Sequence, residues 1–199
     1  MNRNERLQAH WVSVPDYYLP DPQQHLLNPR DCAHFEYSRQ TLTNCKTVLD
    51  VGCWDGWLDF LLIKEGFEVE GVEVVTGLGK AAQRYADIHN LKYKVYDGFF
   101  EELLLEKKYD AVLCYETLEH VHPQGVERYI AALEATSGAK VLISLPNQKH
   151  EDNSPQHLWT PTLEVITQLF GHKPNLNVIY RDYPGTTIPG NWFIHYTVK

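Results

Sequence analysis

The sequence has no apolar run that approaches the roughly 20 residues of a membrane-spanning helix. Its first residues, Met1 to Glu5, are polar and lack the apolar core of a signal peptide. The four cysteines show no C-x-x-C spacing, which argues against a zinc site and against a disulfide framework. Together these absences predict a soluble, cytoplasmic protein with reduced thiols.

Positive charge is also scarce. Lys and Arg number 18 against 26 Asp and Glu, so the formal net charge is −8 at pH 7. Because sequence-independent attraction to a phosphate backbone depends on clustered Lys and Arg, this balance disfavours nucleic acid as a partner. A local basic patch on an acidic protein would still allow nucleic acid to bind.

Internal repeats and low-complexity tracts are absent as well. With 43% hydrophobic and 22% charged residues, the 199 residues suffice for one globular domain with a packed core. Residues 1–45 carry prolines and aromatics without helical or strand periodicity, and they predict a partly irregular N-terminal arm. Its aromatics Trp11, Tyr17 and Tyr18 either form a lid over a bound substrate or cap the core.

From Lys46 onward, apolar segments rich in β-branched residues alternate with amphipathic ones. Strands are predicted over 47–51, 69–74, 93–96, 111–114, 141–145, 177–181 and 192–198. Helices are predicted over 58–64, 79–89, 126–135 and 161–170. The alternation is typical of βαβ units and predicts a doubly wound α/β fold with helices on both faces of the sheet. The last two strands have only a loop between them, which predicts an antiparallel hairpin at the sheet edge.

A loop with two glycines follows the first buried strand and leads directly into a helix; it reads Asp50-Val51-Gly52-Cys53-Trp54-Asp55-Gly56. Glycines at such a turn allow tight backbone geometry and the close approach of a ligand. The helix N-terminus points its N–H groups into the same crevice. A spaced pair of glycines also occurs in plain turns, so the loop alone leaves both interpretations open.

Acidic residues end the next two strands. Glu73 lies about twenty residues beyond the loop, where a carboxylate can bind ribose hydroxyls. Asp97, followed by Gly98, ends the third strand, and a short polar side chain there can accept a hydrogen bond from an adenine amino group. An Asp-Gly pair is also typical of a simple turn.

In order and spacing these motifs resemble those of the class I S-adenosylmethionine (SAM) dependent methyltransferases, in their small-molecule, type 11/12-like branch. The resemblance covers residues 46–199 and rests on four segments: Val48 to Cys53, Gly71 to Glu73, Tyr109 to Val121, and Leu142 to Asn147. It implies a Rossmann-like methyltransferase domain with a seven-stranded mixed sheet of order 3-2-1-4-5-7-6. Residues 1–45 would then be an N-terminal arm or lid.

The resemblance also implies which residues bind the cofactor SAM. It assigns Asp50, Gly52 and Gly56 to the methionine part, Glu73 to the ribose, Asp97 to the adenine, and Tyr115 or Glu116 to the inner edge of the cofactor. The remaining residues expected in the cofactor site are Cys53, Trp54, Val74 and Gly98.

Trp54 departs from the family pattern, because it stands where the usual middle glycine would be. Its indole must either point away from the cofactor or pack on it. The same substitution argues against a dinucleotide reductase, whose pyrophosphate needs the close backbone approach that a glycine permits.

Methyl transfer from a sulfonium chiefly requires alignment, exclusion of water, and removal of a proton when the acceptor is a hydroxyl. The candidate catalytic residues are Glu119 and His120 after the fourth strand, and His157 after the fifth. Either histidine is a candidate general base, since imidazole is available in its neutral form near pH 7. For His120 the alternative is a residue at a helix start that hydrogen-bonds the backbone.

A divalent metal is a further hypothesis, with four ligands: Glu116, Glu119, His120 and His157. The pattern E-x-x-E-H, then a distant His before Trp159-Thr160, is similar to that of metal-assisted O-methyltransferases of the ubiquinone pathway and of small-RNA ribose 2′-O-methyltransferases. Such an ion would orient the acceptor oxygen and lower its pKa. Because E-x-L-E-H also occurs in relatives that need no metal, the sequence leaves the metal site unknown.

The sequence therefore predicts an enzyme that transfers a methyl group from SAM to a small-molecule acceptor, at oxygen in preference to nitrogen. Two alternatives stay open: a metal-assisted RNA ribose 2′-O-methyltransferase, and a non-catalytic SAM-binding protein. Base methylation is disfavoured, because no Asp/Asn-Pro-Pro-aromatic run follows the fourth strand and no Pro-Cys dipeptide is present.

Overall fold

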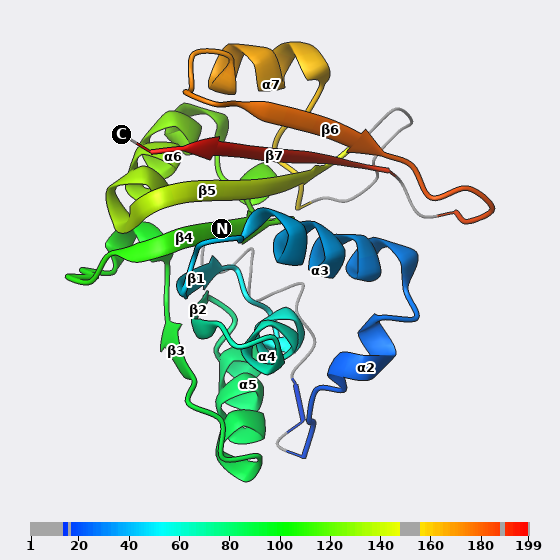
Figure 1. Cartoon of the computed structure of the whole chain (residues 1–199), viewed down its shortest axis with the longest axis vertical. Coiled ribbons are helices and arrows are strands. Elements are labelled where there is room, and N and C mark those ends of the chain that lie inside the picture. The colour runs from blue at the N-terminus through cyan, green and yellow to red at the C-terminus, as the bar shows by residue number, and fades with distance from the viewer. Residues whose placement is uncertain (1–13, 16, 148–155, 188–189, 199) are drawn as a thin grey trace.

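The computed structural model describes residues 14–15, 17–147, 156–187 and 190–198. These residues contain a seven-stranded sheet of order β3-β2-β1-β4-β5-β7-β6 (Figure 1). Its strands are β1 (Thr47–Val51), β2 (Glu68–Glu73), β3 (Lys94–Asp97), β4 (Tyr109–Tyr115), β5 (Ser137–Pro146), β6 (Asn177–Arg181) and β7 (Asn191–Thr197). β1 to β5 are parallel, and β7 is antiparallel to both β5 and β6. The predicted fold class, strand order and edge hairpin are confirmed.

Helices cover both faces of this sheet (Figure 1). They are α2 (Pro22–His25), α3 (Pro29–Thr41), α4 (Trp57–Lys64), α5 (Thr76–Ile88), α6 (Val126–Thr136) and α7 (Leu163–Phe170). α6 and α7 pack on one face, whereas α3 and α4 pack on the other, with α5 against α4. Among the described residues, every helix is too short or too polar to cross a membrane.

The strand core explains why the apolar runs are continuous. Leu49 and Val51 of β1 join the cluster under α6 and α7, and Val48 joins the cluster under α3 and α4. Successive side chains of a strand point to opposite faces, so a strand covered on both faces has to be apolar throughout. β1, β4 and β5 meet this condition, and their carboxyl ends therefore form a rigid base for a site.

Sequence periodicity predicted neither of the helices that the structure describes before β1, the short α2 and the longer α3. Asn28 caps the start of α3 by accepting a hydrogen bond from the Arg30 N–H, and Pro29 occupies the first turn, where no N–H is needed. Its buried face is largely polar: the His34 ring bonds the Ser144 hydroxyl at 2.8 Å, and Ser38 bonds the Tyr115 hydroxyl at 2.9 Å. A helix that packs through hydrogen bonds shows no apolar stripe, and this is why residues 29–41 were expected to be irregular.

Candidate functional site

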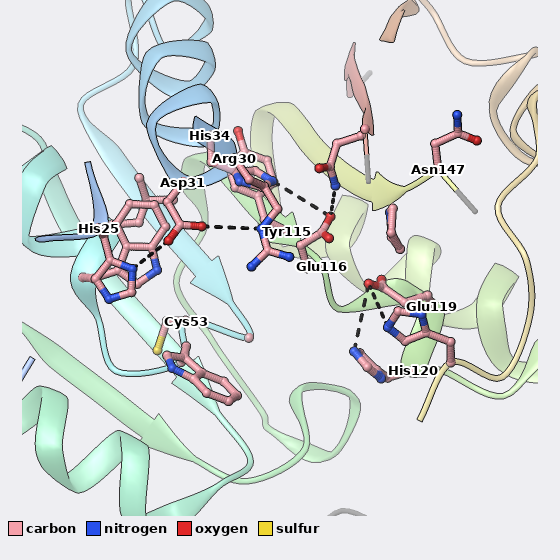
Figure 2. Close-up of a pocket in the computed structure, with 18 of the residues that line it drawn as sticks. His25, Arg30, Asp31, His34, Cys53, Tyr115, Glu116, Glu119, His120 and Asn147 are labelled. Atoms are coloured by element: carbon pink, nitrogen blue, oxygen red, sulfur yellow. Dashed lines mark hydrogen bonds and ion pairs between the residues drawn. The ribbon is translucent and has the colours of Figure 1, made fainter. Parts of the chain in front are cut away.

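Two adjoining cavities open at the carboxyl ends of β1, β2, β4 and β5. The large cavity has a volume of about 830 Å³ and reaches from α2 and α3 to β6 and β7 (Figure 2). The small cavity, of about 120 Å³, lies beside β2 and the segment after β3. Four residues line both cavities: Gly52, Trp54, Glu116 and His120. The two cavities therefore meet at the loop after β1 and at the end of β4.

The loop after β1 depends on its glycines. Gly52 has φ 85°, and a Cβ built on it would overlap the Oγ1 of Thr117. Gly56 has φ 80°, and its Cβ would lie 2.9 Å from the Phe60 ring. Gly52 lies at the junction of the cavities, whereas Gly56 is not among the residues that line either one. Gly56 thus allows α4 to start tightly against α5, and Gly52 allows the loop to pass close to Thr117.

Glu73 holds this loop from β2. Its carboxylate is buried and accepts hydrogen bonds from the Trp54 N–H at 2.8 Å and from the Val75 N–H at 2.7 Å. Burial raises the pKa of Glu73 to about 7. Trp54 has φ 57°, in the left-handed region that a glycine would favour, and the Glu73 contact stabilises that conformation. Trp54 thus stands in place of the family's middle glycine in a conformation that glycine adopts readily.

Not all residues expected around the adenosine part line the small cavity. Glu73, Val74 and Gly98 line it. Asp97 instead lies exposed, and its carboxylate accepts a hydrogen bond from the Thr76 hydroxyl at 3.0 Å. A role for Asp97 toward adenine stays a prediction.

The methionine side of the expected site belongs to the large cavity. Asp50, Cys53 and Tyr115 line it and are buried. Asp50 is the last but one residue of β1, and its carboxyl is 4% exposed. A buried carboxyl at the edge of a cavity is suited to a cationic ligand group, because burial without a partner disfavours its charged form.

Glu116 is held at the junction by partners that sequence reasoning did not identify. Its Oε1 accepts hydrogen bonds from the Ser144 hydroxyl at 2.8 Å and from the Asn191 amide at 2.7 Å. The His34 ring lies 3.9 Å from the same oxygen, and burial lowers the pKa of His34. Glu116 also has φ 48°, an uncommon conformation for a residue other than glycine. The resulting network joins α3, β4, β5 and β7, which lie far apart in the sequence.

Glu119 and His120 lie on the opposite wall (Figure 2), and His157 comes together with them. Each offers one possible ligand atom, and these atoms lie within 4.8 Å of one another. The Nε2 atoms of both histidines lie 4.0 Å from Oε1 of Glu119, whose side chain is buried. These donors suit a divalent metal ion or a proton-transfer site.

This cluster includes three of the four proposed metal ligands. Figure 2 shows Glu116 turned toward α3 and away from Glu119. Because Ser144 and Asn191 engage Oε1 of Glu116, that carboxylate belongs to a different network from the cluster. The segment around His157 is fixed next to the cluster, since the Leu158 N–H donates to the Glu119 carbonyl at 2.9 Å.

The N-terminal segment supplies one wall of the large cavity. His25, Arg30 and Asp31 line it from α2 and α3. The Tyr18 hydroxyl donates to the buried Asp55 carboxylate at 2.6 Å, which ties the segment to the loop after β1. Tyr17 is 86% exposed, and Trp11 lies outside the described residues. Of the three predicted lid aromatics, Tyr18 is the one seen in contact with the loop.

A family model described as "Methyltransferase domain" matches residues 17–178 of the chain. Among curated proteins, the ubiquinone biosynthesis O-methyltransferase of Coxiella burnetii (strain Dugway 5J108-111) is 35% identical over 130 residues, which cover 62% of this chain and 53% of that protein. The enzyme of the same name from Rickettsia akari (strain Hartford) is 36% identical over 74 residues, covering 37% and 30%. The chain thus spans about a third to a half of these relatives.

Solved structures share the fold along nearly the whole chain. Magnesium protoporphyrin IX methyltransferase from Synechocystis PCC 6803 with bound SAM has a TM-score of 0.70 at 14% identity, covering 100% of this chain and 98% of that one. The PH0226 protein from Pyrococcus horikoshii OT3 has a TM-score of 0.67 at 15% identity, covering 98% and 99%. At these identities the likeness concerns the fold.

Proposed function

The chain belongs to the class I SAM-dependent methyltransferase family, and from this membership we propose that it transfers the methyl group of SAM to a hydroxyl of a small molecule. The observation that carries the proposal is the junction of the two cavities. Residues expected to hold the cofactor meet there with His120, which belongs to the cluster of groups able to handle a proton.

The residues that line the two cavities support SAM as the cofactor. Gly52 lines both cavities, and a Cβ there would overlap the Thr117 side chain, so the loop needs glycine at this position. Asp50 with Gly52 would hold the methionine part in the large cavity. Glu73 would hold the ribose from the small cavity, next to Gly98. When bound, SAM supplies an electrophilic methyl group on its sulfonium.

The chain's own residues would orient the acceptor and remove its proton. His120 faces both cavities, and its Nδ1 is 3.1 Å from the Gln156 carbonyl oxygen, a contact that orients the imidazole ring. The buried Glu119 carboxylate, 4.0 Å from Nε2, would stabilise the protonated form of the ring. His157 contacts the same carboxylate from the other side. Closure of the site by α2 and α3 would exclude water from the acceptor.

A divalent ion held by Glu119, His120 and His157 is the second form of this proposal. The close approach of their three ligand atoms favours it. Such an ion would fix the acceptor oxygen and lower its pKa, so that a weaker base would suffice. The ubiquinone-pathway relatives named above are O-methyltransferases, which agrees with either form of the proposal.

The lining of the large cavity favours a small molecule over RNA. Among its described residues Arg30 is the single arginine or lysine, against five acidic ones: Asp31, Asp50, Glu116, Glu119 and Asp182. A polyanion would be repelled by such a wall. An open cavity of about 830 Å³ also disfavours a SAM-binding protein without an acceptor pocket.

The test is transfer of radiolabelled methyl from SAM to a panel of phenolic, catecholic and sugar hydroxyls, with RNA as a comparison. We expect turnover of at least one small hydroxyl compound and a loss of about 10²–10⁴-fold in His120→Ala. His172→Ala, a substitution at an exposed residue beyond α7, is the matched control. Transfer to RNA alone, or full activity of His120→Ala, would contradict the proposal. Loss of activity with chelator and recovery with Mg²⁺ or Mn²⁺ would select the metal-assisted form.

A further inference from the structure

Two buried aspartates lie in contact beneath the loop after β1. Asp50 is near the end of β1, and Asp59 is in the first turn of α4; they are 4% and 0% exposed. Oδ1 of each aspartate is buried and receives no hydrogen bond from a donor in the part of the chain that the structure describes, so the two carboxyls are placed to share a proton. Asp50 lines the large cavity, whereas Asp59 is not among its lining residues. Asp59 therefore reaches the cavity only through Asp50.

A tyrosine completes this arrangement from the other side. The Tyr93 hydroxyl, just before β3, donates to Oδ2 of Asp59 at 2.6 Å and lies 3.5 Å from Sγ of Cys53. Gly71 of β2 makes the space for this contact, because a Cβ there would lie 2.6 Å from Sγ of Cys53 and 3.1 Å from Oδ2 of Asp59. The packing is thus built around the aspartate pair.

The titratable groups that face the pair are all acidic or neutral. They are Cys53 and Asp55 from the loop, Glu73 from β2, Tyr93 from the segment before β3, and Cys114 and Tyr115 from β4. Two touching carboxyls in such surroundings cannot both be ionised, so they share a proton. Burial raises the pKa of Asp50 to about 6, and burial together with the Asp50 charge raises the pKa of Asp59 well above its usual range. The proton therefore belongs chiefly to Asp59.

We propose that Asp59 is a positioning residue that holds one proton against Asp50, so that the pair presents a single negative charge to a cationic group in the large cavity. This inference rests on the proposed function, since that cation would be the ammonium group of SAM. In a hydrogen-bonded series, Tyr93 donates to Asp59 and Asp59 donates to Asp50. The carboxylate oxygen of Asp50 that does not accept from Asp59 is then held in place to bind the ammonium group.

The consequence is that SAM binding depends on pH. Below pH 6 Asp50 takes up a second proton, the pair becomes neutral, and the ammonium group loses its partner. With a midpoint near the pKa of about 6, the affinity should be about tenfold weaker at pH 5 than at pH 7. The pair should release a proton when SAM binds near the midpoint, and this release is measurable by calorimetry in two buffers of different ionisation enthalpy.

Asp59→Asn separates this role from simple packing. Its amide can donate to Asp50 and accept from Tyr93, but it carries no titratable proton. Because the amide replaces the protonated carboxyl as a neutral donor, the pKa of Asp50 should stay as in the wild type, and so should the pH midpoint of SAM binding. Asp59→Leu lacks the donor, so its midpoint should move to higher pH. Asp87→Asn, at an exposed position of α5, should keep the wild-type midpoint.

Glu73 also titrates near neutral pH, so each comparison is repeated in a Glu73→Gln background. A shifted midpoint in Asp59→Asn, an unchanged midpoint in Asp59→Leu, or pH-independent binding by the wild type would overturn the inference. The absence of SAM binding at every pH would instead refute the proposed cofactor site.

A measurement on the protein without SAM tests the shared proton even if SAM does not bind or the variants do not fold. Carbon-13 NMR of the aspartate carboxyls in the free wild-type protein should show one carboxyl that is still protonated at pH 7. If every aspartate titrates near its ordinary pKa of about 4, the pair holds no proton and the inference is wrong.

Discussion

Replacing Gly52 with alanine should destabilise the fold by a predictable amount. Gly52 has φ 85°, and an L-residue in this region costs about 1–2 kcal/mol. The added methyl also overlaps Oγ1 of Thr117 and lies 3.0 Å from its Cγ2, and overpacking of this kind costs about 1–3 kcal/mol. The free energy of unfolding should therefore fall by about 2–5 kcal/mol.

The two contributions can be separated by a second substitution. Thr117→Ala removes Oγ1 and Cγ2 and leaves Cβ 3.1 Å from the added methyl, so the double variant should recover most of the overpacking part and retain the backbone strain. The interaction free energy in this cycle should be about 1–3 kcal/mol. Gly66→Ala is the matched control, since Gly66 has φ 97° and a Cβ there meets nothing within 4 Å. It should cost the strain alone.

The assay is urea unfolding at neutral pH, analysed by linear extrapolation with equal slopes. The reasoning is refuted if Gly52→Ala costs no more than Gly66→Ala, or if Thr117→Ala restores none of the lost stability. Because Gly52 lines both cavities, the alanine variant should also bind SAM more weakly than the wild type does.

Three further predictions concern the groups that hold the loop. Glu73→Ala should weaken SAM binding by about 1–3 kcal/mol. It should also lower the free energy of unfolding, because the N–H groups of Trp54 and Val75 lose their acceptor. An unchanged affinity for SAM in calorimetry would contradict the assignment of Glu73 to the ribose. The pKa of Glu73 is raised from 4.5 to about 7, so protonation of Glu73 stabilises the fold; this contribution is fully present below pH 4.5 and is lost as the pH rises through 7. Glu73→Gln should remove this part of the pH dependence of the free energy of unfolding. If the variant keeps the wild-type pH dependence, the prediction is wrong. Tyr18→Phe should cost about 1–3 kcal/mol, because the buried Asp55 loses a hydrogen bond of 2.6 Å, and no change in urea unfolding would show that this contact is weak.

The sheet could be predicted because its signal is local. The buried strands are apolar on both faces, and the glycines mark the turn after β1 at the position where the chain needs positive φ. Strand order followed from the family resemblance. Helix α3 could not be predicted in the same way, because His34 and Ser38 pack by hydrogen bonds to residues of β5 and β4 that lie far along the chain.

The residues of the site likewise fall into those that the sequence predicts and those that it does not. Residue types at strand ends pointed to Glu73, Glu119 and His120. The family resemblance added Asp50 and grouped the more distant His157 with Glu119 and His120. The partners of these groups depend on tertiary contacts. Asp59 resembles any polar residue of an amphipathic helix until its burial against Asp50 is known.

The partners of Glu116 show the same limit. Asn191 begins β7, and its contact with Glu116 spans 75 residues of sequence. This contact, together with the positive φ of Glu116, separates that carboxylate from the cluster that its motif had suggested it would join. Spacing along the chain therefore predicts which groups reach the site, whereas long-range hydrogen bonds decide where each one points.

Calorimetric titration of SAM and of its demethylated product into the purified protein, with NAD as the control, tests the central claim most directly. We expect both SAM and its product to bind, NAD not to bind, and Gly52→Ala to weaken the binding of both. Binding of NAD, or no binding of SAM at neutral pH, would contradict the assignment of these cavities to the methyl donor.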